Sequence, residues 1–242
     1  MNTLARIIIT SIVSILMLSC NFSMNLGPGV DGNGNVVSAE RNISSEFSSI
    51  KVSQGLDLYI TQSTDVELSI EADENLHDLI MTEVENDVLR IYSTENIRRA
   101  TSKKVMLNIT DISAIKATSG SDVYATNTIE VDELELNTTS GADMELSVKT
   151  QTLNCHSTSG SDIKLSGTTD MLIAEATSGS DIKASDLKAK NSKVKATSGA
   201  DISVNTSKEI TARATSGGDI KYSGNPEKVN KSDSSSGSVR KQ

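Results

Sequence analysis

The 242-residue sequence has no tryptophan, only two phenylalanines and four tyrosines, so aromatic side chains cannot fill a thick core. The apolar and small residues that remain are chiefly Ala, Ser, Ile, Leu and Val. Side chains of this size suit a thin cross-section, such as the interior of a narrow stacked coil. The shortage of aromatic residues therefore favours one elongated repeat domain.

Positive charge is also scarce, because the net charge at neutral pH is −9. The basic pairs Arg98–Arg99 and Lys103–Lys104 are typical of a solvated strand edge and make no extended basic patch. A polyanion needs such a patch. We therefore expect no nucleic-acid partner.

Cysteine occurs only at Cys20 and Cys155. Arg6, the apolar run 7–18 and Ser19 precede Cys20 and have the order of a secretory signal, and the run is too short to span a bilayer comfortably. Residues 17–20, Met-Leu-Ser-Cys, resemble the lipobox of bacterial lipoproteins. By that resemblance residues 1–19 are a lipoprotein signal peptide and Cys20 is acylated; the alternative is an ordinary cleaved signal.

The segment after Cys20 is rich in Asn, Gly and Ser and shows no periodicity. This composition predicts a flexible tether over residues 20–44. Residues 45–240 then form one β-helical domain.

One pentapeptide, Thr-Ser-Gly-x-Asp with a small residue at x, occurs six times within residues 118–219. A degenerate seventh copy carries Val239 in place of the aspartate. The copies follow one another at intervals of about 20 residues, which is typical of a solenoid. A unit of this length holds two or three short strands and no helix, so the sequence predicts an all-β, right-handed parallel β-helix.

Polar and apolar residues alternate through each repeat, which predicts the direction of every side chain. Apolar positions continue in phase through the serine of the motif, so we expect this serine column to face inward, with Cys155 a buried free thiol. The glycine column is the expected bend, where a positive φ or close backbone approach excludes a side chain. The aspartates face outward and stack at about 4.8 Å. The three columns are Ser119, Ser140, Ser159, Ser178, Ser198 and Ser216; Gly120, Gly141, Gly160, Gly179, Gly199 and Gly217; and Asp122, Asp143, Asp162, Asp181, Asp201 and Asp219.

The region before the repeats is also rich in strand patterns. Residues 53–57 match the motif at Ser, Gly and Asp and are interpreted as a degenerate first coil. Apolar residues at helical spacing predict one short helix over 74–85.

The order of these segments resembles a known family. A lipobox, a tether, the strand Val-Ser-Gln-Gly-Leu-Asp-Leu-Tyr-Ile, the hairpin Val-Glu-Asn-Asp-Val-Leu-Arg-Ile and the repeats are similar to the auto-transporter adhesin "head GIN domain" family of Bacteroidetes-type bacteria. The resemblance covers about residues 45–240. It implies a β-helical fold, an adhesin or surface role and no catalytic motif.

Stacked aspartates repel one another, so something has to compensate their charge. Calcium is one candidate, because carboxylate oxygens suit hard cations. The alternative is that turn N–H groups, neighbouring threonines and the lysines two places on, Lys164, Lys183 and Lys221, satisfy each carboxylate. The sequence lacks the nine-residue, multi-glycine repeats of calcium-binding β-helices, which favours the second interpretation and predicts no metal and no cofactor.

Catalysis finds little support in the sequence. His77 and His156 are the only histidines, and the six motif serines have no evident base. We expect His156 to be a surface residue. The favoured function is a non-catalytic, lipid-anchored module of the cell envelope, adhesin-like or structural, attached to the outer membrane and facing either the periplasm or the cell surface.

The alternative is a carbohydrate-active β-helix enzyme, a polysaccharide lyase or hydrolase. Such enzymes hold sugars with long loops and aromatic platforms, whereas here the connections are short and Tyr124 and Tyr222 make only a thin platform. A glycan or a protein is the expected ligand class, and the sequence does not choose between them.

Overall fold

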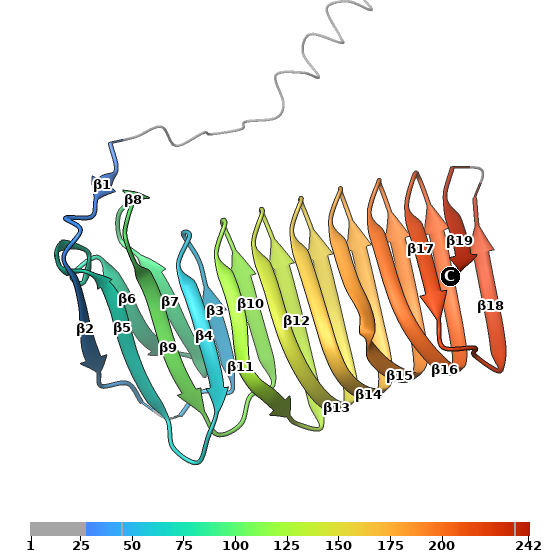
Figure 1. Ribbon diagram of the computed structural model, residues 1–242, viewed down its shortest axis with the longest axis horizontal. Coiled ribbons are helices and arrows are strands. Elements are labelled where there is room, and N and C mark those ends of the chain that lie inside the picture. The colour runs from blue at the N-terminus through green and yellow to red at the C-terminus, as the bar shows by residue number, and fades with distance from the viewer. Residues whose placement is uncertain (1–27, 45, 235) are drawn as a thin grey trace, which may run out of the picture.

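The computed structural model describes residues 28–44, 46–234 and 236–242, and it is a parallel β-solenoid of about 7 turns with about 19 residues per turn. The coils lie side by side along the long axis (Figure 1). The elements are β1 (Val30–Asp31), β2 (Val36–Arg41), β3 (Ser49–Val52), β4 (Asp57–Gln62), β5 (Glu67–Asp73), the 3-10 helix η1 (Glu74–Leu76), β6 (Ile80–Glu85), β7 (Val88–Ser93), β8 (Ile97–Arg99), β9 (Lys103–Ile109), β10 (Ala114–Thr118), β11 (Asp122–Glu130), β12 (Glu133–Thr139), β13 (Asp143–Thr158), β14 (Asp162–Thr177), β15 (Asp181–Thr197), β16 (Asp201–Thr215), β17 (Asp219–Ser223), β18 (Lys228–Asp233) and β19 (Ser238–Lys241).

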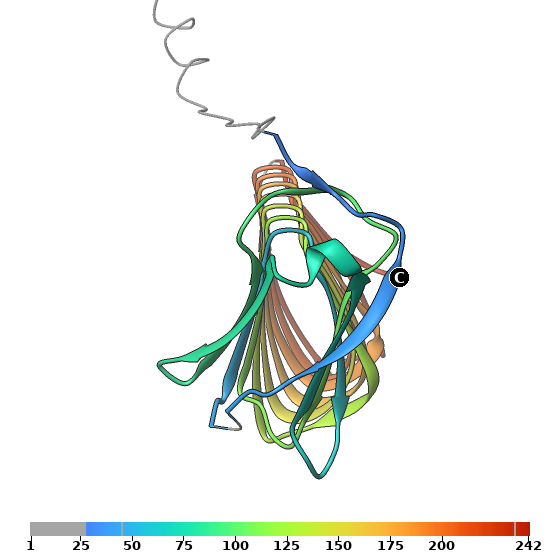
Figure 2. The same ribbon diagram turned by 90° about the vertical axis from the view of Figure 1, so that its left-hand side faces the viewer.

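Each long strand forms both walls of one coil. It begins at the motif aspartate, runs down one face, bends and climbs the other face to the next motif threonine. We call the two walls the Asp face and the Thr face. Viewed along the axis, the coils superimpose, with tight turns at one edge and a wide bend at the other (Figure 2). Pairing is parallel from coil to coil and in register for nearly the whole length of β13 and β14.

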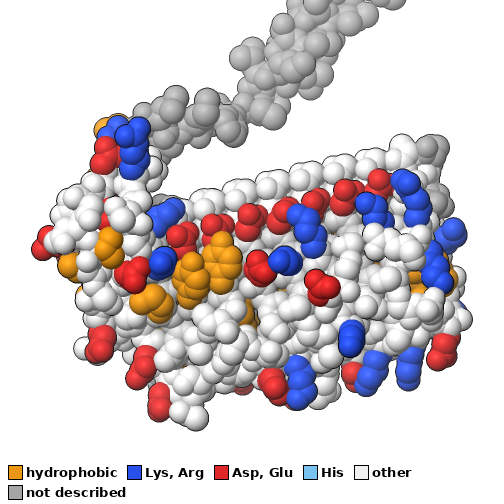
Figure 3. All heavy atoms as spheres, in the orientation of Figure 1, with side chains coloured by type: hydrophobic (Ala, Val, Ile, Leu, Met, Phe, Trp, Pro, Cys, Tyr) orange, Lys and Arg blue, Asp and Glu red, His pale blue; other side chains and the backbone are white. Residues whose placement is uncertain are grey.

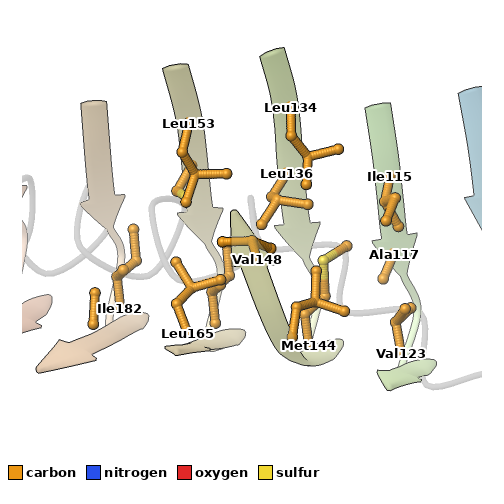
Figure 4. Packing of buried hydrophobic residues seen from close by; sticks show 14 of the residues in the cluster. Ile115, Ala117, Val123, Leu134, Leu136, Met144, Val148, Leu153, Leu165 and Ile182 are labelled. Carbon is orange, nitrogen blue, oxygen red and sulfur yellow. The ribbon is translucent and has the colours of Figure 1, made fainter. Parts of the chain in front are cut away.

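The core is a continuous stack of aliphatic side chains between the two faces. Leu134 and Leu136 of one coil lie against Leu153 of the next, and Met144 and Val148 approach them from the other wall (Figure 4). Cys155 is buried in this stack and forms no disulfide, which confirms the prediction of a buried free thiol. Burial raises the pKa of its thiol, so Cys155 behaves as a small hydrophobic residue.

The tight turn corrects the predicted direction of the motif serine. In the fourth full repeat Ser178 and Gly179 both have positive φ, 59° and 68°, and both are exposed, whereas Ser180 is completely buried. Two consecutive left-handed residues reverse the chain, so Ser178 points outward, while Ser180, which has the same phase and is also expected inside, is buried. The motif serines that the sequence places inside, and the structure places outside, are Ser119, Ser140, Ser159, Ser178, Ser198 and Ser216.

The motif glycine is required by backbone conformation and not by crowding. A Cβ at Gly120, Gly141, Gly160, Gly179 or Gly199 would meet nothing within 4 Å, but each of these residues has a φ near +70°. The turns are joined to one another as well, because the Gly160 N–H donates to the Ser178 carbonyl at 3.2 Å and the Gly179 N–H to the Ser198 carbonyl at 3.1 Å.

The buried residue after the glycine closes the turn from inside. The Ser180 hydroxyl donates to the Thr177 carbonyl at 2.8 Å or the Ser157 carbonyl at 2.7 Å, and it accepts the Thr177 N–H at 3.1 Å. Ser161 makes the equivalent contacts with Thr158. In these two coils the serine hydroxyl thus supplies partners to the backbone groups of the turn.

The N-terminal region differs from the prediction in two places. The helix expected over 74–85 is wrong beyond the 3-10 turn η1, because β6 pairs antiparallel with β7 through a turn at Asn86 and Asp87, where φ is positive at both residues. Ile80 and Val84 are four residues apart, a spacing that fits one face of a strand as well as one face of a helix, and cross-strand pairing prevails over the helical spacing. The tether expected over 20–44 is wrong for Val36–Arg41, which pairs with β5.

The beginning of the chain, including the signal peptide and Cys20, lies outside the described residues. In the described ranges no helix is long and apolar enough to cross a bilayer. The degenerate first coil at 53–57 has the same turn as the repeats, with Gln54 and Gly55 at φ 64° and 72°.

The corrected turn predicts a contrast between two neighbouring serines. Ser180→Leu should lower the free energy of unfolding by about 1–3 kcal/mol through overpacking alone, because the site is fully buried. Ser178→Leu should cost less, since its side chain projects into solvent. Urea unfolding measures both variants, and equal losses would contradict the assigned directions.

Candidate binding surface: the aspartate ladder and its tyrosine neighbours

The motif aspartates form one ladder on the Asp face. Register pairing joins seven of them, since Asp57 of the first coil lies opposite Asp122. Figure 3 shows the ladder as a row of acidic side chains along the molecule, just below the ridge of turns. The members are Asp57, Asp122, Asp143, Asp162, Asp181, Asp201 and Asp219.

A second outward row runs beside the ladder, two residues further along each strand. Side chains two residues apart on a strand share a face, so the row runs parallel to the ladder. We call it the flanking row. From the N-terminal side it contains Met106, Tyr59, Tyr124, Glu145, Lys164, Lys183, Ser203, Lys221 and Arg240.

Lysine and arginine of the flanking row form ion pairs with Asp162, Asp181 and Asp219 in the C-terminal part of the ladder. The Lys183 ammonium lies 2.7 Å from a carboxylate oxygen of Asp162 and 3.4 Å from one of Asp181. Arg240 lies 3.7 Å from Asp219. Burial and two neighbouring carboxylates raise the pKa of Asp201, and Lys221 opposes that rise.

The prediction that threonine hydroxyls and turn N–H groups compensate the charge of the motif aspartates is only partly correct. Among the described residues, the one backbone N–H that donates to a ladder carboxylate is that of Asp162, to Asp143 at 3.1 Å. The motif threonines end the strands of the Thr face, and their hydroxyls contact motif serines, as Thr158 does with Ser159 at 3.4 Å. Lys164 pairs with Glu145 at 2.7 Å and not with an aspartate.

The N-terminal part of the ladder keeps its charge. Of the described residues, none forms an ion pair with Asp57, Asp122 or Asp143. Burial raises the pKa of Asp122, and the charges of Asp57 and Asp143 raise it further, while Lys103 opposes them. Burial likewise raises the pKa of Asp57.

Two tyrosines occupy flanking-row positions at which three later coils place a lysine. The rings of Tyr59 and Tyr124 are stacked, with centroids 5.1 Å apart and an angle of 25° between their planes. Both side chains are partly exposed. Burial raises the pKa of Tyr124, and so does the charge of Asp122, which places that carboxylate within Coulombic reach of the phenol.

The predicted aromatic platform is therefore correct for Tyr124 and wrong for Tyr222. Tyr222 is buried in the last coil with 8% of its surface exposed. Tyr59 takes its place on the surface. An alignment of the degenerate first coil with the repeats could have found it, because Tyr59 follows Asp57 as Tyr124 follows Asp122.

Metal and nucleophilic chemistry have little support in the part of the chain that the structure describes. It contains no group of three or more His, Cys, Asp or Glu side chains that could hold an ion. His156 is exposed on the Thr face. The His77 ring lies beside β2, with its Nε2 3.1 Å from the Val37 carbonyl.

These features define an elongated β-solenoid with an acidic, partly aromatic surface. The family model described as "Putative auto-transporter adhesin, head GIN domain" matches residues 46–226, and the chain belongs to this family. No curated protein matches the chain.

Solved structures agree on the fold. A putative adhesin from Bacteroides fragilis has a TM-score of 0.82 at 23% identity, covering 88% of this chain and 100% of that one. A putative lipid binding protein from Parabacteroides distasonis has a TM-score of 0.71 at 25% identity, covering 88% and 99%. A putative adhesin from Parabacteroides merdae has a TM-score of 0.71 at 19% identity, covering 88% and 98%.

The unpaired charge of Asp122 predicts how stability depends on pH. Because its pKa is raised in the folded state, the folded protein is destabilised at neutral pH and regains that stability as pH falls through the folded pKa. Asp122→Asn should therefore raise the free energy of unfolding at pH 7 by about 0.2–1 kcal/mol. The gain over the wild type should vanish as the pH falls through that pKa.

Asp162→Asn is the matched control, because it breaks the ion pair with Lys183. We expect it to be neutral or slightly destabilising at pH 7. A loss of stability for Asp122→Asn in the same urea titrations would contradict the account of the ladder.

Proposed function

We propose that this protein is a non-catalytic, lipid-anchored binding module of the bacterial cell envelope. The observation that carries the proposal is the partly exposed N-terminal part of the aspartate ladder, where Asp57 and Asp122 have no ion pair among the described residues, beside two stacked tyrosines. Exposed aromatic rings and unpaired carboxylates destabilise an isolated domain and suit a partner that covers them.

The adhesin-like role draws support from the family description and from the neighbours in Bacteroides and Parabacteroides that are named putative adhesins. One neighbour is named for lipid binding. The interior of this chain is filled by packed aliphatic side chains, and nothing in its described part favours a lipid in the core.

A carbohydrate-active enzyme is the weaker alternative. The motif turns consist of two exposed residues each, and within residues 28–44, 46–234 and 236–242 no long loop on the Asp face encloses a substrate. The carboxylates on this face belong to one repeated ladder on an open wall, which gives no enclosed pair for an acid and a base on either side of a glycosidic bond.

Cys20 is proposed as the site of the lipid anchor, because the residues that precede it resemble a lipobox. Acylation there would place the solenoid at the outer membrane, on its periplasmic or its outer side. With one acylated cysteine and the described domain beginning near residue 28, the lipid would hold the N-terminal coils, and with them the tyrosine pair, nearest the bilayer.

Replacement of Cys20 tests the anchor. Cys20→Ala should move the protein from the membrane fraction to the aqueous phase of a detergent partition, because acylation requires the thiol. Cys155→Ala is the matched control, since that thiol is buried and should leave partitioning unchanged. Retention of Cys20→Ala in the membrane fraction would refute the lipoprotein proposal.

A further inference from the structure

The flanking row changes chemistry along the solenoid, and the change coincides with the charge of the ladder. In the C-terminal coils Lys183 lies between the carboxylates of Asp162 and Asp181. At the equivalent positions of two N-terminal coils the chain has Tyr59 and Tyr124. The same backbone site thus carries an internal cation in one half and an aromatic ring in the other.

The cations nearest the N-terminal carboxylates have other partners. Lys104 lies 3.3 Å from Glu71, and the Lys103 ammonium donates to the Gly55 carbonyl. In the described part of the chain, neither Asp57 nor Asp122 has a side-chain hydrogen bond or an ion pair. Neither carboxylate therefore has a cationic partner of the kind that Lys183 is for Asp162 and Asp181.

The stacked rings of Tyr59 and Tyr124 add a second group that attracts a cation beside the unpaired carboxylates. A cation above a tyrosine face is attracted by the ring quadrupole, and the attraction grows when water is displaced. A lysine or arginine of a partner, placed over Tyr124, would lie where the ladder lacks a cation. Beyond Tyr59 the flanking row continues through Met106 into a groove of about 280 Å³, which Val66 and Glu67 also line.

We propose that Tyr59, Tyr124, Asp57 and Asp122 form a docking surface for lysine or arginine side chains of a basic polypeptide segment. The proposal rests on the proposed function as a binding module and names the class of partner. Lysine and arginine fit both parts of the surface, because their aliphatic stems cover apolar groups such as Met106 while the charged head reaches a carboxylate.

The shape of the surface favours a polypeptide over a small cation. The tyrosines lie on the open wall of a regular sheet, whereas sites for small molecules are concave. A neutral glycan could also stack on the rings, but it would leave two adjacent carboxylates uncompensated. The seven-carboxylate ladder repels acidic glycans and anionic lipid headgroups.

Binding of short peptides of defined charge tests the proposal. The full-length purified protein is titrated with hexalysine and hexaarginine in a calorimeter at low salt, and with hexaglutamate and the neutral glycan cellohexaose as comparison probes. We expect the two cationic peptides to bind, the other probes not to bind, and added salt to weaken the affinity.

Variants locate the site. Asp122→Asn should weaken binding of hexalysine about threefold to tenfold, as expected for one ion pair with a cation–π contact. Asp181→Asn is the matched control on the same ladder, and we expect less than about a twofold change because Lys183 already faces that position. Tyr124→Lys places an internal lysine where Lys183 stands in a later coil and should remove binding while keeping or raising the melting temperature.

Three results would overturn the proposal. They are no binding of either cationic peptide, an equal loss for Asp181→Asn and Asp122→Asn, or cellohexaose binding that Tyr124→Lys removes. Either of the first two results would remove the basic segment as the partner but would not contradict the proposed anchored binding module. The third would indicate that the ligand of this surface is a neutral glycan. If Tyr124→Lys does not fold, the comparison of Asp122→Asn with Asp181→Asn decides alone.

Discussion

The architecture depends on a two-residue turn in which a serine and a glycine both adopt positive φ. Such a turn reverses the chain within two residues, and the glycine is needed because an alanine in the left-handed region is strained. Its glycine N–H bonds to the serine carbonyl of the next coil, as at Gly160 and Ser178. Each turn therefore fixes both the edge of its own coil and the position of the next one.

The same turn creates the electrostatic problem of the molecule. Since in seven coils an aspartate follows the glycine of the turn by two residues, stacking in register brings seven carboxylates into one row. Lys183 and Arg240 relieve the row near the C-terminus. Tyr59 and Tyr124 replace such cations near the N-terminus, and this asymmetry distinguishes a surface available to a partner from one that is already complete.

Much of the fold could be predicted from the sequence, because stacking converts a repeat into a geometry. The spacing of the glycines predicted the coil, and alternation predicted the buried Cys155 and the outward aspartates. Alternation failed at Ser178, since it holds only where the backbone stays extended, but it resumes in the same phase at the buried Ser180. The helix over 74–85 failed for a different reason: the spacing of Ile80 and Val84 fits a strand as well as a helix, and only the pairing of β6 with β7 selects the strand.

The candidate binding surface was harder to predict from the sequence than the fold. The aspartates were evident, but their compensation depends on which side chain stands in the flanking row of the adjacent coil, and that requires the register. Lys164 illustrates this, since it follows an aspartate in sequence and pairs with Glu145 of the preceding coil. Tyr222 follows an aspartate by three residues rather than two, and that one position turns it into the core.

Hydrogen exchange at the turn glycines tests the central claim most directly. Gly160 and Gly179 lie on the exposed ridge, yet their N–H groups donate from one coil to the next. We predict that these amides exchange as slowly as the core strand amides of β14 and β15 when followed by NMR, because both open only with the coil itself. Exchange at the rate of a solvated loop would contradict a solenoid held together through its turns.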